Sequence, residues 1–142
     1  MTLDELQAKA EKDLRIDDTE LDLESLKTPQ LHSQYLKTYS TYALMLKKAE
    51  GEHSQLHLNK WLFFTGKADP QVYKDTNFDL KVLRQDVDKF IDADEEIIKS
   101  KQKIEYLKQI CGYCESILKQ INNRTFQIKN AIEWKKFTMG SM

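Results

Sequence analysis

The chain has 142 residues, of which 40% are hydrophobic and 32% charged, with only 4 Gly and 2 Pro. This length suits one compact domain, alone or with an oligomerisation arm, and so few helix-breaking residues favour long helices over a sheet with many turns. The mean hydropathy of -0.65 is polar for a globular monomer and fits elongated helices or a subunit that completes its core with neighbours.

Neither a membrane span nor a signal peptide is expected. No run of about 18 apolar residues is present, and the acidic N-terminus lacks the basic start and apolar middle of a secretion signal. Two cysteines in such a chain suggest free thiols in a reducing compartment. The sequence therefore predicts a cytoplasmic protein.

The net charge is -1, but the charges come in alternating blocks. Residues 1–26 carry a net charge of -6 and residues 68–96 carry -5, whereas residues 27–67 carry +4 and residues 97–142 carry +6. Such blocks can pair across subunits or present a basic track on an otherwise acidic particle.

The first predicted elements are two short helices. Thr2 and Glu5 have the spacing of a capping box, in which two side chains satisfy free backbone N–H groups at the start of a helix. The apolar stripe of this helix comprises Leu3, Leu6, Ala10 and Leu14. Residues 17–19 form the next break, and a second short helix is expected at residues 20–26.

A long helix is predicted from Thr28 to Gly66. Threonine followed by proline gives a capping hydroxyl and a residue suited to the first helical position, and glycine suits the position after a helix end. His53 and Lys60 are polar members of a heptad seam that Gly51 interrupts. The seam comprises Tyr35, Tyr39, Tyr42, Leu46, Ala49, His53, Leu56, Lys60 and Phe63.

The connection to the last long helix carries weaker signals. Asp69 and Pro70 favour a short helix. Residues 77–94 fit a helix, an extended chain or a small hairpin, and we favour a connector with at most one short β segment near residues 78–92. Asp94 then suits the cap of the next helix, whose first residues are acidic and complement the helix dipole.

The last long helix has the strongest periodic signal. Its a and d positions are Ile97, Ile104, Leu107, Cys111, Cys114, Leu118, Ile121, Ile128 and Ile132. Ile110 and Ile117 widen this stripe beyond the needs of a two-stranded coiled coil, so several helices are expected to meet there. Asn122 and Asn123 mark a kink or a cap before a final helix through Phe137. The predicted fold class is all-α, with long amphipathic helices and heptad seams.

No pattern of catalytic residues emerges. Cys111 and Cys114 have CxxC spacing, but redox pairs of this type sit at a helix start, whereas these cysteines occupy mid-helix core positions. His53 and His57 are four residues apart and could join the cysteines around zinc, although this spacing often arises by chance. Phosphate-loop, dinucleotide, zinc-protease and nucleophile-elbow motifs are absent from the sequence. We expect no enzymatic activity, no cofactor and no metal.

The end of the first long helix combines basic and aromatic residues, namely Lys60, Trp61, Phe63, Phe64 and Lys67. Lysines neutralise phosphates, and exposed aromatic rings can stack on unpaired bases for about 1–3 kcal/mol each. The alternative is that the aromatic residues are core, which the seam position of Phe63 favours. Trp61 is the ring expected to be exposed.

The segment at residues 124–137 is also basic and aromatic. It could bind nucleic acid or dock on a neighbouring subunit. Its apolar residues cover much of the helix circumference, which favours burial in an assembly with Lys129, Lys135 and Lys136 outside. These apolar residues are Phe126, Ile128, Ala131, Ile132 and Trp134.

Several segments have counterparts, in the same order and over nearly the whole chain, in one known family. They lie near residues 3–7 and 12–21, at residues 29–36 and 124–129, and onward to Gly140. In these segments the chain resembles the UvsY recombination mediators of T4-like bacteriophages. The resemblance implies a protein of the infected bacterial host that forms ring-like homo-oligomers and binds single-stranded DNA. It also implies that the protein helps a RecA-like phage recombinase to load onto DNA covered by the phage single-strand-binding protein.

The family has a basic-aromatic DNA-binding motif where this chain has residues 58–64. Lys60 matches the second of two basic positions, and Leu58 stands at the first. Phe63 and Phe64 replace paired tyrosines and keep the stacking faces. Because Leu58 carries no charge, one positive charge of the family motif is missing here. Three other lysines are candidates to supply it, namely Lys47, Lys48 and Lys67.

The family's oligomerisation region is C-terminal, in agreement with the wide apolar stripe. We therefore divide the chain into residues 1–93, a helical region with the DNA-binding segment, and residues 94–142, a helical oligomerisation region. The expected oligomerisation residues are Leu107, Cys111, Cys114, Leu118, Ile121, Phe126, Ile128, Ile132 and Trp134.

Two other functions share the same sequence features. A structural or adaptor coiled-coil protein without nucleic-acid binding would have the same heptads and charge blocks. A small metal-binding regulator would use His53, His57, Cys111 and Cys114.

Overall fold

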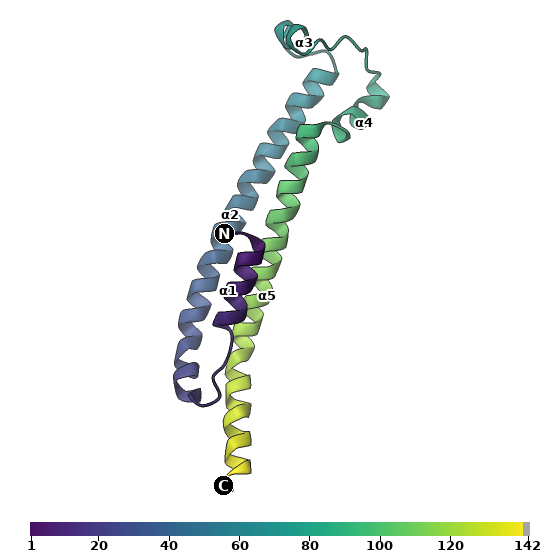
Figure 1. The fold of residues 1–142 in the computed structure, drawn as a ribbon. Helices are drawn as coiled ribbons and strands as arrows, with labels where there is room; N and C mark the ends of the chain where they lie inside the picture. Colours follow the sequence, from purple (N-terminus) through teal and green to yellow (C-terminus); the bar gives the residue numbers. More distant parts are fainter. Residues whose placement is uncertain (141–142) are drawn as a thin grey trace. The chain divides into compact units, whose positions relative to one another are not determined.

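The computed structural model describes residues 1–140, which form helices joined by short connections (Figure 1). The elements are α1 (Leu3–Asp13), α2 (Leu21–Phe64), α3 (Pro70–Thr76), the 3-10 helix η1 (Arg84–Asp86), α4 (Val87–Asp92) and α5 (Glu95–Thr138). The described residues contain no β-strand. The all-α prediction is confirmed, and the short β segment considered near residues 78–92 is not present.

The chain forms two compact units, to each of which α2 and α5 contribute. The first unit is Met1–Ala43 with Gln109–Met142, and the second is Leu44–Lys108. These units are defined by spatial contacts, and their boundaries differ from the division between residues 93 and 94. That division separates a DNA-binding region from an oligomerisation region, and it stays a prediction.

In the first unit, α1 lies alongside α2 and α5 (Figure 1). Each helix places residues spaced by three or four on one face, and these faces meet in a common core. The buried members are Leu6, Ala10, Leu31, Tyr35, Ile110, Cys114, Ile117 and Ile121. Because an isolated helix of 11 residues is marginal in water, packing against this core is what holds α1.

In the second unit, the end of α2 and the start of α5 are joined by α3, η1 and α4. Their core contains the buried residues Phe64, Val87, Ile91 and Ile97. Leu56, Trp61, Phe63, Phe78, Val82 and Phe90 pack around it while partly buried. The connection at residues 77–94 is therefore partly helical, because Val87 and Ile91, four residues apart, bury one face of α4.

Most of the predicted helix ends are confirmed. The Thr2–Glu5 capping box is present at the start of α1. After α2, Gly66 has a φ of 78°, and the N–H groups of Gly66 and Lys67 donate to the carbonyls of Phe63 and Leu62 at 3.2 and 2.8 Å. This is a Schellman motif, in which glycine takes the left-handed conformation without strain.

The start of α2 differs from the prediction. The helix begins at Leu21, so Pro29 lies inside it rather than at its first position. Proline in a helix interior removes one hydrogen bond and costs about 3 kcal/mol. Leu21, Glu24 and Leu31 are buried on both sides of Pro29, and this packing keeps the helix continuous.

The end of the chain also differs. Asn122 and Asn123 neither cap nor end a helix, because α5 runs from Glu95 to Thr138 without a break. Both asparagines are exposed, so their amides face solvent and do not compete with the helical hydrogen bonds.

Candidate nucleic-acid interface

The predicted DNA-binding residues occupy the last turns of α2, where α3 folds back over the helix end. Asp69 caps α3 by accepting from the N–H of Gln71 at 2.9 Å, and Pro70 begins the helix. This places the Tyr73 hydroxyl 2.6 Å from the carbonyl of Phe63, to which it donates. The Phe63 carbonyl, which also accepts from the Gly66 N–H at 3.2 Å, thereby gains a second donor from α3.

Phe63 and Phe64 belong to an aromatic cluster within the second unit. The ring of Phe63 stacks on Tyr73 with a centroid distance of 5.0 Å and an interplanar angle of 13°. Phe64 packs against Phe78 and Phe90 at 5.7 and 5.6 Å. Both rings are therefore engaged by the protein's own aromatic side chains, as the core interpretation predicts.

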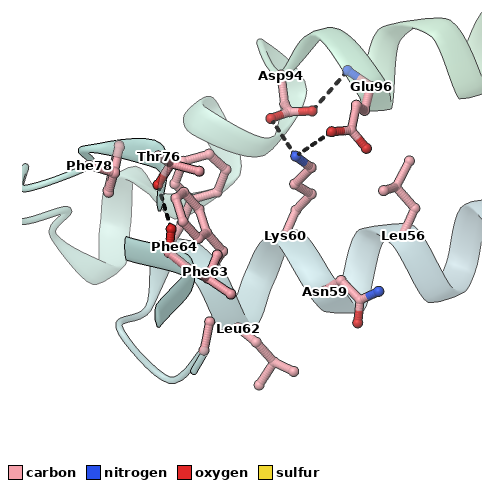
Figure 2. Close-up of a pocket in the computed structure, with 12 residues that line it drawn as sticks. Leu56, Asn59, Lys60, Leu62, Phe63, Phe64, Thr76, Phe78, Asp94 and Glu96 are labelled. Carbon is pink, nitrogen blue, oxygen red and sulfur yellow. Dashed lines mark hydrogen bonds and ion pairs between the residues drawn. The ribbon is translucent and has the colours of Figure 1, made fainter. Parts of the chain in front are cut away.

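Lys60 is held by two carboxylates at the start of α5 (Figure 2). Its Nζ lies 3.1 Å from Asp94 Oδ2 and 3.3 Å from Glu96 Oε1. Burial acts to lower the pKa of Lys60, but the hydrogen bonds and charges of both carboxylates outweigh it, so the pKa is raised. The lysine is thus fully charged and already paired.

Asp94 and Glu96 hold Lys60 in different ways. The Asp94 side chain is 16% exposed and also caps α5, because its Oδ1 accepts from the N–H groups of Glu96 and Ile97 at 2.9 and 3.2 Å. The Glu96 side chain is 67% exposed. Asp94 is therefore fixed by the helix start, whereas Glu96 can turn into solvent.

Trp61 and Lys67 form a second pair beside this region. The Lys67 Nζ lies 4.5 Å from the centroid of the Trp61 ring, within the range of a cation–π contact. Lys67 is exposed and Trp61 is half-buried against the core. Cation and aromatic face are thus together at the surface, an arrangement suited to a phosphate and its neighbouring base.

The remaining basic candidates, Lys47 and Lys48, lie on the α2 segment of the second unit and are exposed. Neither is occupied by a described ion pair, so both charges are available to phosphates. The structure therefore brings together Lys60, Phe63 and Phe64, pairs Lys67 with Trp61, and leaves Lys47 and Lys48 on the helix surface.

A cavity of about 710 Å³ lies beside Lys60. Phe63, Phe64 and Phe78 line its apolar part, and Lys60, Asp94 and Glu96 line its polar part (Figure 2). This volume is within the range of small-molecule sites, about 300–1,000 Å³. The walls of the cavity thus combine aromatic side chains with one ammonium and two carboxylates.

The predicted oligomerisation residues fall into two groups. Leu107, Cys111, Cys114, Ile121 and Ile128 are buried, and Leu118 is partly buried against the core of the first unit. Phe126, Ile132 and Trp134 are 65%, 36% and 64% exposed. Only the second group is exposed on the surface of the described chain, and the role of both groups in oligomerisation stays a prediction.

Phe137 was not among the predicted oligomerisation residues, but it lies on the same side of α5 as two of the exposed ones. At about 100° per residue, Phe126, Trp134 and Phe137 share one side of α5, opposite the buried Ile121 and Ile128. Phe137 is 75% exposed, and its ring stacks on Trp134 at 5.7 Å. The end of α5 thus has an outer aromatic face.

The structure gives no positive support to a redox pair at Cys111 and Cys114 or to a zinc site that includes them. Cys111 and Cys114 are buried free thiols. Among the described residues, no three His, Cys, Asp or Glu side chains are grouped so that they could hold a metal ion.

In the same part of the chain, no helix has the length and apolar character to span a membrane.

From the sequence, Asp94 and Glu96 are predicted only to cap and begin α5, and not to contact Lys60. Their contact with Lys60 joins positions 36 residues apart, from Lys60 to Glu96. The one available signal was the lysine itself, since a charged residue on an apolar seam needs a partner.

Residues 9–141 match the family described as "Recombination, repair and ssDNA binding protein UvsY". The recombination protein uvsY of Enterobacteria phage T4 is 22% identical over 140 residues, which cover 99% of both chains. Crystal structures of the bacteriophage T4 recombination mediator protein UvsY in lattice types II and IV give TM-scores of 0.85 and 0.83. Their identities are 22% and 21%, and they cover 98% and 97% of this chain and 98% and 99% of their own.

The structural likeness establishes a shared fold, and the family match extends over almost the whole chain. The chain belongs to the UvsY family of recombination, repair and single-stranded-DNA-binding proteins.

Proposed function

We propose that this chain is a recombination mediator without enzymatic activity, acting in the cytoplasm of an infected bacterium. As a homo-oligomer it binds single-stranded DNA and promotes loading of a RecA-like recombinase onto DNA covered by a single-strand-binding protein. The observation that carries the proposal is the family match at residues 9–141, since that family is described by single-stranded DNA binding. The related phage T4 protein is itself named a recombination mediator.

Basic side chains along the second unit support a DNA track. Lys47, Lys48 and Lys67 are exposed, and Lys67 lies over Trp61. Lysine contacts to phosphate and stacking on a tryptophan ring require no particular base, so binding should depend on salt and little on sequence. Each subunit offers few such contacts, and repetition around an oligomer raises the effective concentration of the next site.

The outer face of α5 supports the homo-oligomer. Phe126, Trp134 and Phe137 are each at least 64% exposed and share one side of the helix. Large aromatic residues gathered on one helix side are typical of a surface that a partner covers. We expect the double change Trp134→Ser and Phe137→Ser to reduce the mass measured by light scattering. The matched change Leu26→Ser, at a side chain 76% exposed in the same unit, should leave the mass unchanged.

A second candidate is an adaptor without a DNA role. It is favoured by the ion pairs of Lys60 and by the packing of Phe63 and Phe64 into the aromatic cluster. In that case these residues only stabilise the end of α2. Nucleic acid would then have no effect on the environment of Trp61.

The deciding experiment measures binding of a labelled poly-dT strand across salt concentrations, with light scattering on the same samples. A Trp134→Phe variant leaves Trp61 as the only tryptophan, so its fluorescence reports on the candidate site. Salt-sensitive binding by an oligomer, with a change in Trp61 fluorescence, supports the proposal. An oligomer that ignores the strand even at low salt supports the adaptor.

A further inference from the structure

The environment of Lys60 is unusual for a phosphate-binding lysine. Its side chain is only 19% exposed, and two carboxylates lie within 3.3 Å of its Nζ. One ammonium and two carboxylates leave a net negative charge at this point. An approaching phosphate would therefore meet repulsion from Asp94 and Glu96 as well as attraction from Lys60.

The two carboxylates differ in how easily they can leave. Asp94 is bound to the first turn of α5 through two backbone N–H groups, in addition to Lys60. Among the described hydrogen bonds and ion pairs, the Glu96 carboxylate has only the one to Lys60, and its side chain is largely exposed. Because the Glu96 carboxylate lies largely in solvent, this contact holds it weakly, and an anion of higher charge density can replace it on Lys60.

We propose that Glu96 occupies in the free protein the position on Lys60 that a DNA phosphate takes in the complex, so that Glu96 competes directly with the strand. This inference rests on the proposed function, and it adds to the same site a carboxylate that regulates DNA binding. Asp94 stays in place and keeps the ammonium oriented, while Glu96 turns into solvent. Phosphate and carboxylate each supply an oxygen acceptor at the same distance, so the exchange leaves the Lys60 donor satisfied throughout.

The competition has a consequence for the site as a whole. When a DNA strand contacts the protein at Lys60 alone, the cost of displacing Glu96 weakens its binding. Strands already held at neighbouring lysines reach Lys60 at high local concentration and can displace the carboxylate. Isolated contacts are thus disfavoured relative to contacts made along a bound strand.

Glu96→Gln tests the proposal, and Glu95→Gln is its matched control. Both changes remove one negative charge from the first turn of α5, and both side chains are exposed, but only Glu96 contacts Lys60. We expect Glu96→Gln to tighten binding of a dT strand of about ten nucleotides by about threefold at low salt, and Glu95→Gln to have a smaller effect.

A second pair of variants isolates the role of Lys60. With Lys60→Gln in both, the difference between Glu96→Gln and Glu95→Gln should disappear, because no ammonium remains to be competed for. Equal affinities of Glu96→Gln and Glu95→Gln in the presence of Lys60 would overturn the inference while leaving the proposed function intact. If the unaltered protein does not bind dT at low salt, the proposed function itself fails and the inference falls with it.

Discussion

The guanidinium of Arg124 on α5 donates both to the carboxylate and to the backbone carbonyl of Glu24 on α2. The two residues are 1% and 3% exposed, so this is a buried ion pair within the first unit. Arg124 also donates to the carbonyl of Leu14 at 3.2 Å, just after α1. One side chain therefore ties together the three helices of that unit.

Removing one partner should destabilise the protein strongly. Glu24→Ala leaves the Arg124 charge buried without its carboxylate, and we expect the free energy of unfolding to fall by about 3 kcal/mol. Urea unfolding followed by circular dichroism measures this. Asp22→Ala, an exposed carboxylate in the same first turn, controls for the helix dipole and should cost less than about 1 kcal/mol.

A double variant completes this test. Replacing both residues with methionine removes the buried charges together, and the loss should be smaller than for Glu24→Ala. A double variant that is less stable than the single one would show that the remaining hydrogen bonds of Arg124, and not the charge pair, hold the helices.

Stability should fall on the acid side of neutrality. Hydrogen bonds from Lys27 and Arg124 lower the pKa of Glu24 against the effect of burial. Burial acts to raise the pKa of Asp13, but hydrogen bonds from Tyr35 and Lys9 outweigh it and lower this pKa as well. Both groups have lower pKa values folded than unfolded, where the usual values are 4.5 and 3.8. Their stabilisation is complete above those values and is lost as the pH falls through the lower folded values.

The free energy of unfolding measured between about pH 6 and pH 3 checks this dependence. Asp13→Asn should reduce the slope, because one of the two titrating groups is gone. The control is Asp4→Asn, an exposed aspartate of the same helix. An acid slope that is identical in Asp13→Asn and the unaltered protein would contradict the role of Asp13.

Lys60→Ala should weaken binding of single-stranded DNA and make it less dependent on salt. If Lys60 neutralises one phosphate, the slope of log affinity against log salt should fall by about 0.7. Lys89→Ala is the control, since Lys89 is exposed on α4 and pairs with Asp86. An unchanged slope in Lys60→Ala, with circular dichroism showing an intact fold, removes Lys60 from the site.

The two cysteines should be inert in the folded protein. Burial raises the pKa of Cys114 to about 11, and burial together with the charge of Glu115 raises that of Cys111. Near pH 8 almost no thiolate is present, so alkylation by iodoacetamide should be slow and should become fast in urea. Rapid alkylation of the folded protein, followed by mass spectrometry, would contradict their placement in the core.

Local features of the fold could be predicted because neighbouring residues determine them. The capping box at Thr2 and Glu5, the Gly66 turn and the Asp94 cap each depend on a few consecutive residues. The wide stripe on α5 was also readable, since its period sets the buried face. That stripe is filled by α1 and α2 of the same chain, at least within the first unit.

Features that depend on distant partners could not be predicted. Pro29 is a typical helix start, and only the burial of Leu21 and Glu24 explains why α2 begins earlier. Glu24 and Arg124 are 100 residues apart, and no periodicity joins them. In the candidate site, the residue types at the end of α2 were informative, but the pairing of Lys60 required the fold.

Pro29 has one more consequence, which concerns local opening. It has no N–H, so the carbonyl of Ser25 lacks its helical donor, and the turn before Pro29 is joined to the rest of α2 by fewer hydrogen bonds. Glu24, at the centre of this segment, is held from α5 through Arg124. Amide hydrogen exchange at residues 21–28 will therefore follow the opening of a neighbouring helix more closely than the melting of α2 itself.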